Sequence, residues 1–493
     1  MKKYLLLIVL FLLAAALAPA QQNPSFDEAV TRKMESLADS LTQHLKEWKV
    51  PEAVFKVEKF GAVADGKTIN TKAIQLAIDE CSRSGGGTVL FSAGDYVTGT
   101  IELKSNVMLC VAKGARILGS IDLSDYPERI ESFKSVMSEI HHYRISLIYA
   151  EKAINTGICG KGEIYFRGEE EHFPGPETIS AIEGRPFGIR MIECKNVVVK
   201  DITLRNAAAW MQSYLYCEDL IFDGIKVFNQ ANYNNDGLDP DGCRNVIVRN
   251  CFISSHDDAM CLKGASAKPC ENILIENSTF YTACNAFKLG TDTQGDFRNI
   301  IVRNSVLGGL PDSLPSFKNF YDCSTGITLA TTDGGNVENI LIRDVEISRS
   351  RCPVFLCTGR RGRRLDETMQ QPGSLKNIVI KNVTGKENRL QGSLINGIKS
   401  SIIENVLIRN MNISTIGGGT VEMANRPVAE NEKGYPDAQE FSRTGLPAYG
   451  FYIRYAKNIS LENVKITPEK VEQRPEFKSE ATVENVIING KII

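Results

Sequence analysis

The chain has 493 residues, of which 43% are hydrophobic and 24% charged, and its formal net charge is −2. This balance gives no reason to expect a nucleic acid or an anionic membrane surface as a partner. The length allows a large core, and the 40 glycines together with many Asn-Ile and Asn-Val pairs indicate one repetitive structure instead of several separate domains.

A secretory signal is predicted at the N-terminus. Lys2 and Lys3 precede an apolar run over residues 5–17, and small residues follow up to Ala20. The run is short for a membrane anchor, and no stop-transfer charges come after it. We therefore expect residues 1–20 to be removed and the protein to be exported, to the periplasm or the outside of the cell.

Two helices are predicted before the repetitive part. Residues 21–54 carry apolar side chains at helical spacing and predict a helical extension that packs on the body. A second helix is expected from about Thr71 to Ser82, where three consecutive glycines end it before a strand. That helix would close the open end of a stack of strands, as the caps of repeat proteins do.

One unit then recurs: an apolar residue, any residue, Asn, Ile or Val, any residue, and a further Ile, Val or Leu. Its Asn stands at Asn196, Asn245, Asn272, Asn299, Asn339, Asn377, Asn405, Asn458 and Asn485. A period of about 20 to 30 residues with short alternating strands indicates a stacked solenoid. Longer gaps, such as that between Asn405 and Asn458, predict loops inserted into a unit.

The units favour a parallel β-helix over a leucine-rich repeat, because they are rich in β-branched residues, Asn and Gly and have no helical half. In a β-helix each unit is one coil, and equivalent residues stack about 4.8 Å apart. The recurrent Asn would then form side-chain ladders where strands end. We predict an all-β fold, a single-stranded parallel β-helix over residues 55–493 with the Thr71 helix as its cap.

Four of the 13 cysteines, Cys194, Cys217, Cys243 and Cys270, occupy the same slot shortly before the repeat Asn. Later units fill this slot with apolar residues such as Phe297. Free Cys packs in such a place as a small hydrophobe. We therefore expect a buried stack of thiols, not disulfides or metal ligands.

The candidate chemistry lies between Asn234 and Lys263. Asp236 comes first, and the adjacent pair Asp257 and Asp258 follows about one repeat later, so the two groups can face each other on neighbouring coils. Both members of the pair reach solvent only if the chain bends there, since neighbours in a strand point to opposite faces. Carboxylates gathered in this way can cleave a glycosidic bond by acid/base chemistry.

Two other interpretations of these acids stay open at this point. Asp is common in turns, where its role is structural. The run DGLDPDG could form a calcium loop, although its acids do not have the spacing of the helix-loop-helix calcium site.

The acidic runs NNDGLDPDGCRNVIVRNC and HDDAMCLKG resemble hallmark sequences of the polygalacturonase-type pectinases, glycoside hydrolase family 28. The segments FGAVADG and AYGFYIRYAKNISLENV resemble the same family near its two ends, so the likeness covers most of the chain after about residue 54. The resemblance implies a right-handed parallel β-helix and inverting hydrolysis by a single displacement.

By this resemblance Asp257 is the general acid, and Asp236 and Asp258 hold and activate the attacking water. Lys263 keeps the acidic cluster charge-balanced. Clustered like charges are expected to raise the pKa of one carboxyl group. The acid is expected about 6.5 to 9.5 Å from the water-binding pair, the range of inverting enzymes.

The chain departs from the family pattern at the positions that bind the sugar. The family His falls at Asn285, the family Arg-Ile-Lys run at Thr328-Leu329-Ala330, and the Gly before the acidic pair is His256. A replacement cation can come from Lys288 or from the run Arg360, Arg361, Arg363 and Arg364, which is otherwise a solvated face. We expect these residues to bind substrate: Asn234, His256, Lys263, Asn285 and Lys288.

These features predict a divergent family member, an exported glycoside hydrolase that cleaves pectin-type polysaccharides or oligosaccharides containing galacturonate or rhamnogalacturonan. We expect a monomer without cofactor or metal, without a nucleic-acid partner and without membrane insertion after signal cleavage. The alternatives are a polysaccharide lyase on the same scaffold and a non-catalytic glycan-binding solenoid.

Overall fold

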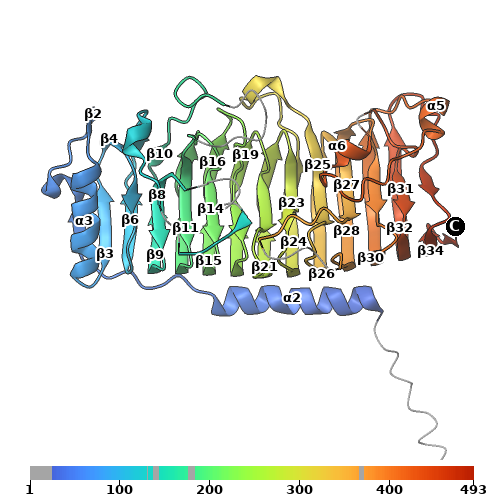
Figure 1. Cartoon of the computed structure of the whole chain (residues 1–493), viewed down its shortest axis with the longest axis horizontal. Helices are drawn as coiled ribbons and strands as arrows, with labels where there is room; N and C mark the ends of the chain where they lie inside the picture. The colour runs from blue at the N-terminus through green and yellow to red at the C-terminus, as the bar shows by residue number, and fades with distance from the viewer. Residues whose placement is uncertain are drawn as a thin grey trace, which may run out of the picture.

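The apolar residues of one repeat pair with those of the next, and nearly all of this pairing is parallel. Val246, Ile273 and Ile300 are buried neighbours on adjacent strands. The computed structural model describes residues 25–129, 132–136, 144–175, 184–365, 371–442 and 444–492 and is a long parallel β-helix (Figure 1). The predicted fold class is confirmed; the predicted signal segment, residues 1–20, lies outside the described residues.

After the first coil, each early coil contributes a strand to each of three faces. The strands of the first face are β1 (Val54–Lys56), β3 (Gly87–Phe91), β6 (Val107–Val111), β9 (Ile154–Cys159), β12 (Lys195–Lys200), β15 (Glu218–Asp223), β18 (Arg244–Arg249) and β21 (Cys270–Glu276). Those of the second face are β2 (Asp65–Ile69), β4 (Gly94–Thr98), β7 (Ala115–Gly119), β10 (Glu163–Tyr165), β13 (Thr203–Arg205), β16 (Lys226–Asn229), β19 (Phe252–Ser255) and β22 (Thr279–Thr282).

In later coils the first two faces are spanned by one longer strand. These strands are β24 (Phe297–Gly308), β26 (Val337–Ser348), β28 (Leu375–Asn388), β30 (Ile403–Thr415) and β32 (Ala456–Pro468). The chain then ends in β34 (Val483–Ile488) and β35 (Lys491–Ile492), which pair antiparallel.

The third face carries the candidate site. In the described part of the chain it is a sheet of 12 strands. They are β5 (Ile101–Glu102), β8 (Ser146–Glu151), β11 (Phe187–Ile192), β14 (Gln212–Leu215), β17 (Asp239–Asp241), β20 (Met260–Gly264), β23 (Asn285–Thr293), β25 (Cys323–Thr331), β27 (Ser350–Thr358), β29 (Ser393–Asn396), β31 (Phe451–Arg454) and β33 (Phe477–Ser479). Single 3₁₀ turns are η1 (Val57–Phe60), η2 (Leu123–Asp125) and η3 (Phe317–Asn319).

The recurrent Asn residues form the predicted ladder. Asn272 donates from Nδ2 to Oδ1 of Asn245 at 3.2 Å, and Asn299 donates to Asn272 at 3.2 Å. Each of the three has a φ of 57°, the left-handed region that Asn tolerates better than most residues. The ladder therefore fixes the bend of the chain at the start of the first-face strands that carry these Asn residues.

The cysteine stack is confirmed as well. Cys194, Cys217, Cys243 and Cys270 are buried free thiols. Cys270 lies in register with Phe297 of the next coil, so the slot is chosen for packing, as the sequence indicates.

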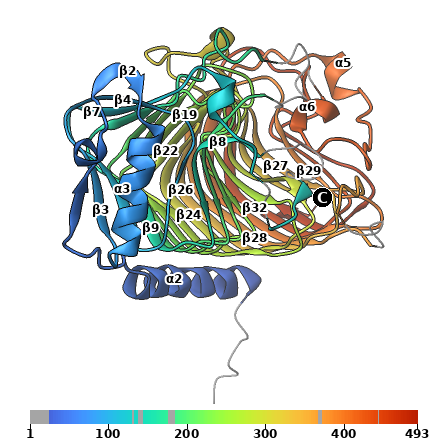
Figure 2. The same cartoon turned by 60° about the vertical axis from the view of Figure 1, so that its left-hand side comes forward.

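Helix α3 (Thr71–Arg83) covers the N-terminal end of the stack, at the position where the cap is predicted (Figure 2). Its buried residues Ile74, Ala77 and Ile78 join the main core. The first coil therefore does not present its apolar interior to water.

Helix α2 (Phe26–His44) lies along the outside of the first face, across several coils (Figure 1). Its buried side chains include Val30, Met34 and Leu41. They pack on a column of outward-facing apolar residues, Ile247, Leu274, Ile301, Leu341, Val379 and Leu407. The helical extension thus packs on the body as predicted.

Acidic residues of α2 meet a basic row beside this column. The row consists of Arg303, Arg343, Lys381 and Arg409, which lie in register on β24, β26, β28 and β30. Glu35 accepts hydrogen bonds from Arg303 at 2.9 Å and from Arg343 at 2.6 Å. The ends of the row also pair with Glu276 and Glu462 of the neighbouring strands, and the helix adds negative charge between them.

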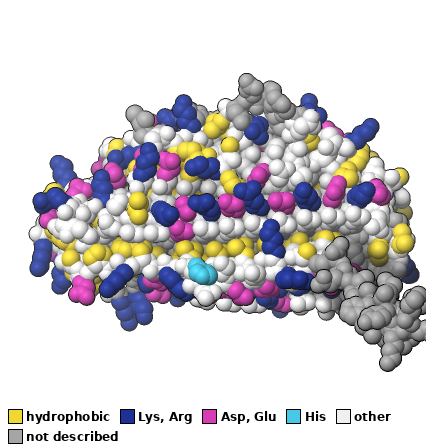
Figure 3. Space-filling model, turned by 90° about the horizontal axis from the view of Figure 1, so that it is seen from below, with side chains coloured by type: hydrophobic (Ala, Val, Ile, Leu, Met, Phe, Trp, Pro, Cys, Tyr) yellow, Lys and Arg dark blue, Asp and Glu magenta, His cyan; other side chains and the backbone are white. Residues whose placement is uncertain are grey.

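A second charged row on the first face alternates in sign. It runs Lys195, Glu218, Arg244, Glu271, Arg298, Glu338, Lys376, Glu404, Lys457 and Glu484, each in register with the next. Figure 3 shows positive and negative side chains interspersed along the length of this side of the molecule. We call this row the charge ladder.

Residues 416–450, between β30 and β31, form an insertion with two short helices, α5 (Val421–Ala424) and α6 (Ala438–Phe441). Phe441 packs with Ala330 and Phe355 on the outer side of the third face. The insertion therefore covers this face beyond the coil that carries β23. Within the described ranges, no helix has the length and apolarity to cross a membrane.

Candidate functional site

The three predicted catalytic carboxylates lie where coils turn onto the third face. Asp236 precedes β17, and Asp257 and Asp258 occupy a bend between β19 and β20. Backbone hydrogen bonds stack the two turns, from Asp257 N to Asn235 O at 3.2 Å and from Gly237 N to Asp258 O at 2.8 Å. The bend that the sequence requires is therefore present, and it brings the acids of adjacent coils together.

Lys263 of β20 neutralises part of this charge. Its Nζ atom lies 3.3 Å from Oδ2 of Asp236 and 3.3 Å from Oδ1 of Asp239, and all three side chains are buried. The ring centroid of Trp210 is 4.1 Å from the same Nζ atom. The predicted position of Lys263 beside the cluster is found, and Asp239 is an additional member that the sequence places only in a turn.

Asp258 is held at both oxygens. Asn285 donates from Nδ2 to Oδ1 at 2.6 Å, and Lys288 donates from Nζ to Oδ2 at 2.9 Å. Although burial acts to raise its pKa, the charges of Lys288 and Lys263 and the Asn285 hydrogen bond together hold the pKa of Asp258 below its ordinary value. Asn285 and Lys288 therefore contact one of the predicted catalytic carboxylates directly.

The pKa values of the other buried acids move the opposite way. Burial, and then the like charge of Asp239, raise the pKa of Asp236 well above its ordinary value, against the attraction of Lys263. Burial raises the pKa of Asp239 to about 7. The expected raised pKa thus falls on Asp236, to which the resemblance gives the base role, and on its neighbour Asp239.

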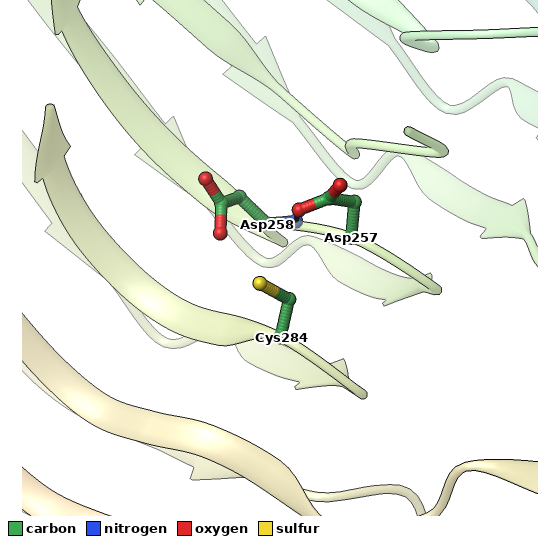
Figure 4. Close-up of side chains that lie close together, drawn as sticks. All are labelled: Asp257, Asp258 and Cys284. Carbon is green, nitrogen blue, oxygen red and sulfur yellow. Dashed lines mark hydrogen bonds between the residues drawn. The ribbon is translucent and has the colours of Figure 1, made fainter. Parts of the chain in front are cut away.

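Asp257 and Asp258 lie close to Cys284, the residue before β23 (Figure 4). One side-chain atom from each of the three lies within 4.8 Å of the others. For Asp257 and Asp258 this closest approach of single oxygen atoms is shorter than the about 6.5 to 9.5 Å expected between the carboxyl groups of the acid and of the water-binding pair. The same three atoms could approach a metal ion, but both Asp258 oxygens already accept hydrogen bonds from Asn285 and Lys288.

Asn234 and His256 border the site. Oδ1 of Asn234 accepts a hydrogen bond from Arg185 at 2.9 Å. The His256 ring packs edge-on against Phe317 of η3, with centroids 4.9 Å apart, and burial lowers its pKa. Tyr233 contacts both of these rings, with centroids 6.2 Å from His256 and 5.3 Å from Phe317. Where the resembling family has Gly, this chain thus has a neutral aromatic group in an aromatic cluster.

The positions of the lost Arg-Ile-Lys run give no replacement cation. Thr328 pairs in register with Lys288, and its hydroxyl lies 2.5 Å from that of Thr325. Ala330 is buried beneath the insertion. Both side chains are uncharged, as the sequence shows.

The arginine run is not the solvated face that is the default for such a run. Arg361 donates to Oδ1 of Asp333 at 3.0 Å and to Thr291 O at 2.9 Å. Arg363 pairs with Asp292 at 3.4 Å. Arg361 and Arg363 are thus anchored to the acids Asp333 and Asp292, whereas Arg360 is exposed.

Two residues near the catalytic acids come from the insertion and carry no signal in the sequence. Tyr435 shares a hydrogen bond with Thr291, with 2.8 Å between the hydroxyl oxygens. Asp437 lies close enough for the charges of Asp258 and Lys288 to act on its pKa, which burial raises. Both are far from the acidic runs in sequence.

A parallel β-helix that gathers buried acids and lysines at the turns of one face defines a β-helical enzyme scaffold. The chain belongs to the glycosyl hydrolases family 28, whose model matches residues 105–432. A second model, described as rhamnogalacturonase A/epimerase, pectate lyase-like, matches residues 54–115. The chain is therefore a glycoside hydrolase acting on O-glycosyl bonds.

Known relatives agree with this assignment. A probable polygalacturonase of Vitis vinifera is 26% identical over 379 residues, covering 72% of this chain and 73% of the relative. An exo-poly-α-D-galacturonosidase of Dickeya chrysanthemi is 24% identical and covers 71% of this chain and 65% of the relative. The exopolygalacturonase structure from Thermotoga maritima matches with a TM-score of 0.69 at 19% identity, covering 88% of this chain and 96% of that one, and so shares the fold.

Proposed function

We propose that this hydrolase cleaves a pectic polysaccharide or oligosaccharide, with Asp257 as general acid and Asp236 and Asp258 around the attacking water. One observation carries the proposal. The three carboxylates converge on one lysine-balanced centre of the third face. Solvated turn carboxylates would not require buried lysines, since burying a charge is costly without a partner.

The three acids differ in a way that suits separate roles. Asp257 is less buried than the other two, so it is placed to meet the leaving glycosidic oxygen. Asp258 is kept ionised by Lys288 and can take a proton from water. Oδ1 of Asp236 has no hydrogen-bond partner among the described residues and can orient that water.

In the proposed step the water oxygen bonds to the anomeric carbon as the glycosidic C–O bond breaks. The Asp257 proton passes to the leaving oxygen, and a water proton passes to the carboxylate pair. One displacement inverts the anomeric configuration.

The test is Asp257→Asn. We expect a loss of turnover of at least about a thousandfold, as removal of a general acid commonly costs 10² to 10⁴, with an unchanged unfolding temperature. Proton NMR of the first product formed by the native enzyme should show inversion. Retention of configuration, or a fully active Asp257→Asn enzyme, would contradict the proposal.

We further propose that the sugar beside the scissile bond is neutral or differently linked, as in a rhamnose-containing pectin. A galacturonate carboxylate needs a cation, but Lys288 is bound to Asp258 and Arg361 is bound to Asp333. Rapid hydrolysis of unbranched polygalacturonate that survives replacement of the loop arginines would contradict this substrate assignment.

Export and a monomeric state complete the proposal. The apolar N-terminal run supports export, and cell fractionation with N-terminal sequencing of the mature protein tests it. Sedimentation of the purified enzyme tests the monomer.

A further inference from the structure

A loop from a later coil folds back onto the turns that carry the predicted catalytic acids. This loop, residues 309–322, joins β24 to β25. The backbone amide of Phe317 donates to Oε1 of Gln230 at 2.9 Å, and Nζ of Lys318 donates to Oε2 of Glu170 at 2.7 Å. The loop is therefore fixed to coils that precede the one from which it leaves.

Four rings meet where the loop folds back, and we call them the aromatic wall: Tyr233, His256, Phe317 and Phe320. The centroid of the His256 ring lies 4.9 Å from that of Phe317 and 5.9 Å from that of Phe320. The two residues between these phenylalanines have φ values of 55° and 61°, in the left-handed region. This sharp turn places both phenylalanine rings against the same histidine.

The aromatic wall adjoins the predicted general acid. His256 directly precedes Asp257 in the chain. The backbone amide of Asp257 donates to the carbonyl oxygen of Asn235, which is two residues beyond Tyr233. The wall thus takes one ring from each of the two turns that carry the predicted acids.

Much of the aromatic wall is open to water. Phe320 is 49% exposed and is the only exposed phenylalanine of the described residues, and the other three rings are partly exposed. Leaving apolar surface in water costs free energy that a ligand packed on it would recover. The Gly that the resembling family has at His256 would give the loop no ring to pack on. The wall is therefore an open aromatic surface that this chain adds beside the acid.

We propose that the aromatic wall is the subsite of the leaving sugar, the pyranose whose glycosidic oxygen receives the Asp257 proton, and that its rings pack on the apolar face of that pyranose. Apolar and aromatic side chains line most ligand sites. Such packing requires no charge on the sugar, so either a galacturonate or a rhamnose can occupy the subsite. The inference rests on the proposed function for the cleavage step and adds the place where the leaving sugar is held.

The first experiment measures turnover with and without a leaving sugar. Phe320→Ala should lower kcat/KM at least about fivefold for an oligosaccharide of galacturonate or of alternating galacturonate and rhamnose, because the stacked contact is lost. The oligosaccharide that loses more identifies the leaving sugar. A glycosyl fluoride of the same glycone releases no sugar, so its kcat/KM should change less than about twofold. The control Leu76→Ala, at an exposed apolar residue of α3, should change neither. An equal loss on both kinds of substrate, or a loss on neither, overturns the subsite.

The second experiment measures binding without chemistry. In an Asp257→Asn background, calorimetric titration with the two oligosaccharides should show binding that Phe320→Ala and His256→Ala each weaken at least about fivefold. His256→Phe should largely preserve this binding, since the ring and not its nitrogens makes the contact. Binding of neither oligosaccharide, or binding that neither alanine variant weakens, overturns the subsite. Binding that depends on the wall, with no hydrolysis of either oligosaccharide by the native enzyme, overturns the proposed function alone.

Discussion

Lys288 illustrates how one side chain sets the state of a catalytic acid. It is buried against Asp258 and lowers the pKa of that carboxyl, so Asp258 is ionised at neutral pH. Its position beside the lost family His led to the expectation of a substrate ligand. In the structure Lys288 is paired with Asp258, one of the proposed catalytic acids.

Lys288→Met should therefore raise the pKa of Asp258 and shift the acidic limb of the kcat–pH profile to higher pH. A loss of kcat of at least about tenfold is expected at neutral pH, because the base is then partly protonated. Lys376→Met, on the exposed charge ladder, is the control and should leave the profile unchanged. An unaltered acidic limb in Lys288→Met would show that Lys288 does not govern this group.

Asp241 shows the reverse effect, away from the predicted catalytic trio. Burial raises its pKa to about 7 from an ordinary value of 3.8. The folded carboxyl therefore keeps a proton that the unfolded chain loses near pH 4, so the free energy of unfolding falls as pH rises from about 4 to about 7.

Asp241→Asn should remove this loss and stabilise the protein at pH 8, by an amount on the order of a few kcal/mol, relative to the native chain. The gain should shrink at pH 5, because Asp241 is then already neutral. Thermal unfolding at both pH values, with the exposed Asp39→Asn as control, measures it. A gain that is the same at pH 5 and pH 8 would contradict the raised pKa.

At the scale of elements, α2 is held by both apolar contacts and charge. Glu35 bridges Arg303 and Arg343, and although burial acts to raise its pKa, these arginines lower it. Glu35→Lys should place a fifth positive charge against the basic row and lower the unfolding temperature by a few degrees, as expected for about 1 to 2 kcal/mol in a chain of this size. Glu28→Lys, exposed on the same helix, should have little effect. Equal effects of the two variants would show that the contact with the row is not stabilising.

The helices and coils could be predicted because their signals are local. Periodic apolar residues and consecutive glycines mark α3, whose predicted end at Ser82 is one residue short of the observed Arg83. The repeat marks each coil. The insertion has neither the helical spacing of apolar residues nor the repeat. Nothing in the sequence therefore indicates that Tyr435 and Asp437 lie near the acidic runs. The sequence gives no signal for Asp239 either, because an Asp in an Asp-rich turn is explained by turn structure alone.

At the scale of the whole molecule, stacking decides which thiols water can reach. Cys110, Cys159 and Cys284 are partly exposed, and the other ten of the 13 cysteines are buried. Cys110 lies in register with Cys159, and their hydrogen bond lowers the pKa of Cys110 to about 7.

A thiol reagent should thus label at most these three residues in the native protein, Cys110 first, and all 13 after denaturation without reductant. Peptide mass spectrometry identifies the sites. Rapid native labelling of the Cys194 to Cys270 stack, or fewer than 13 labels after denaturation, would contradict the buried free thiols of the core.

The charge ladder also limits how such a molecule can change its length. Each of its rungs faces a rung of opposite sign, as Glu271 faces Arg244 on one side and Arg298 on the other. Loss or duplication of a single rung would bring two like charges into direct opposition, which destabilises a strand pair. Loss or duplication of two neighbouring rungs would restore the alternation. Along the charge ladder itself, the alternation of sign is therefore preserved only when coils are gained or lost in even numbers.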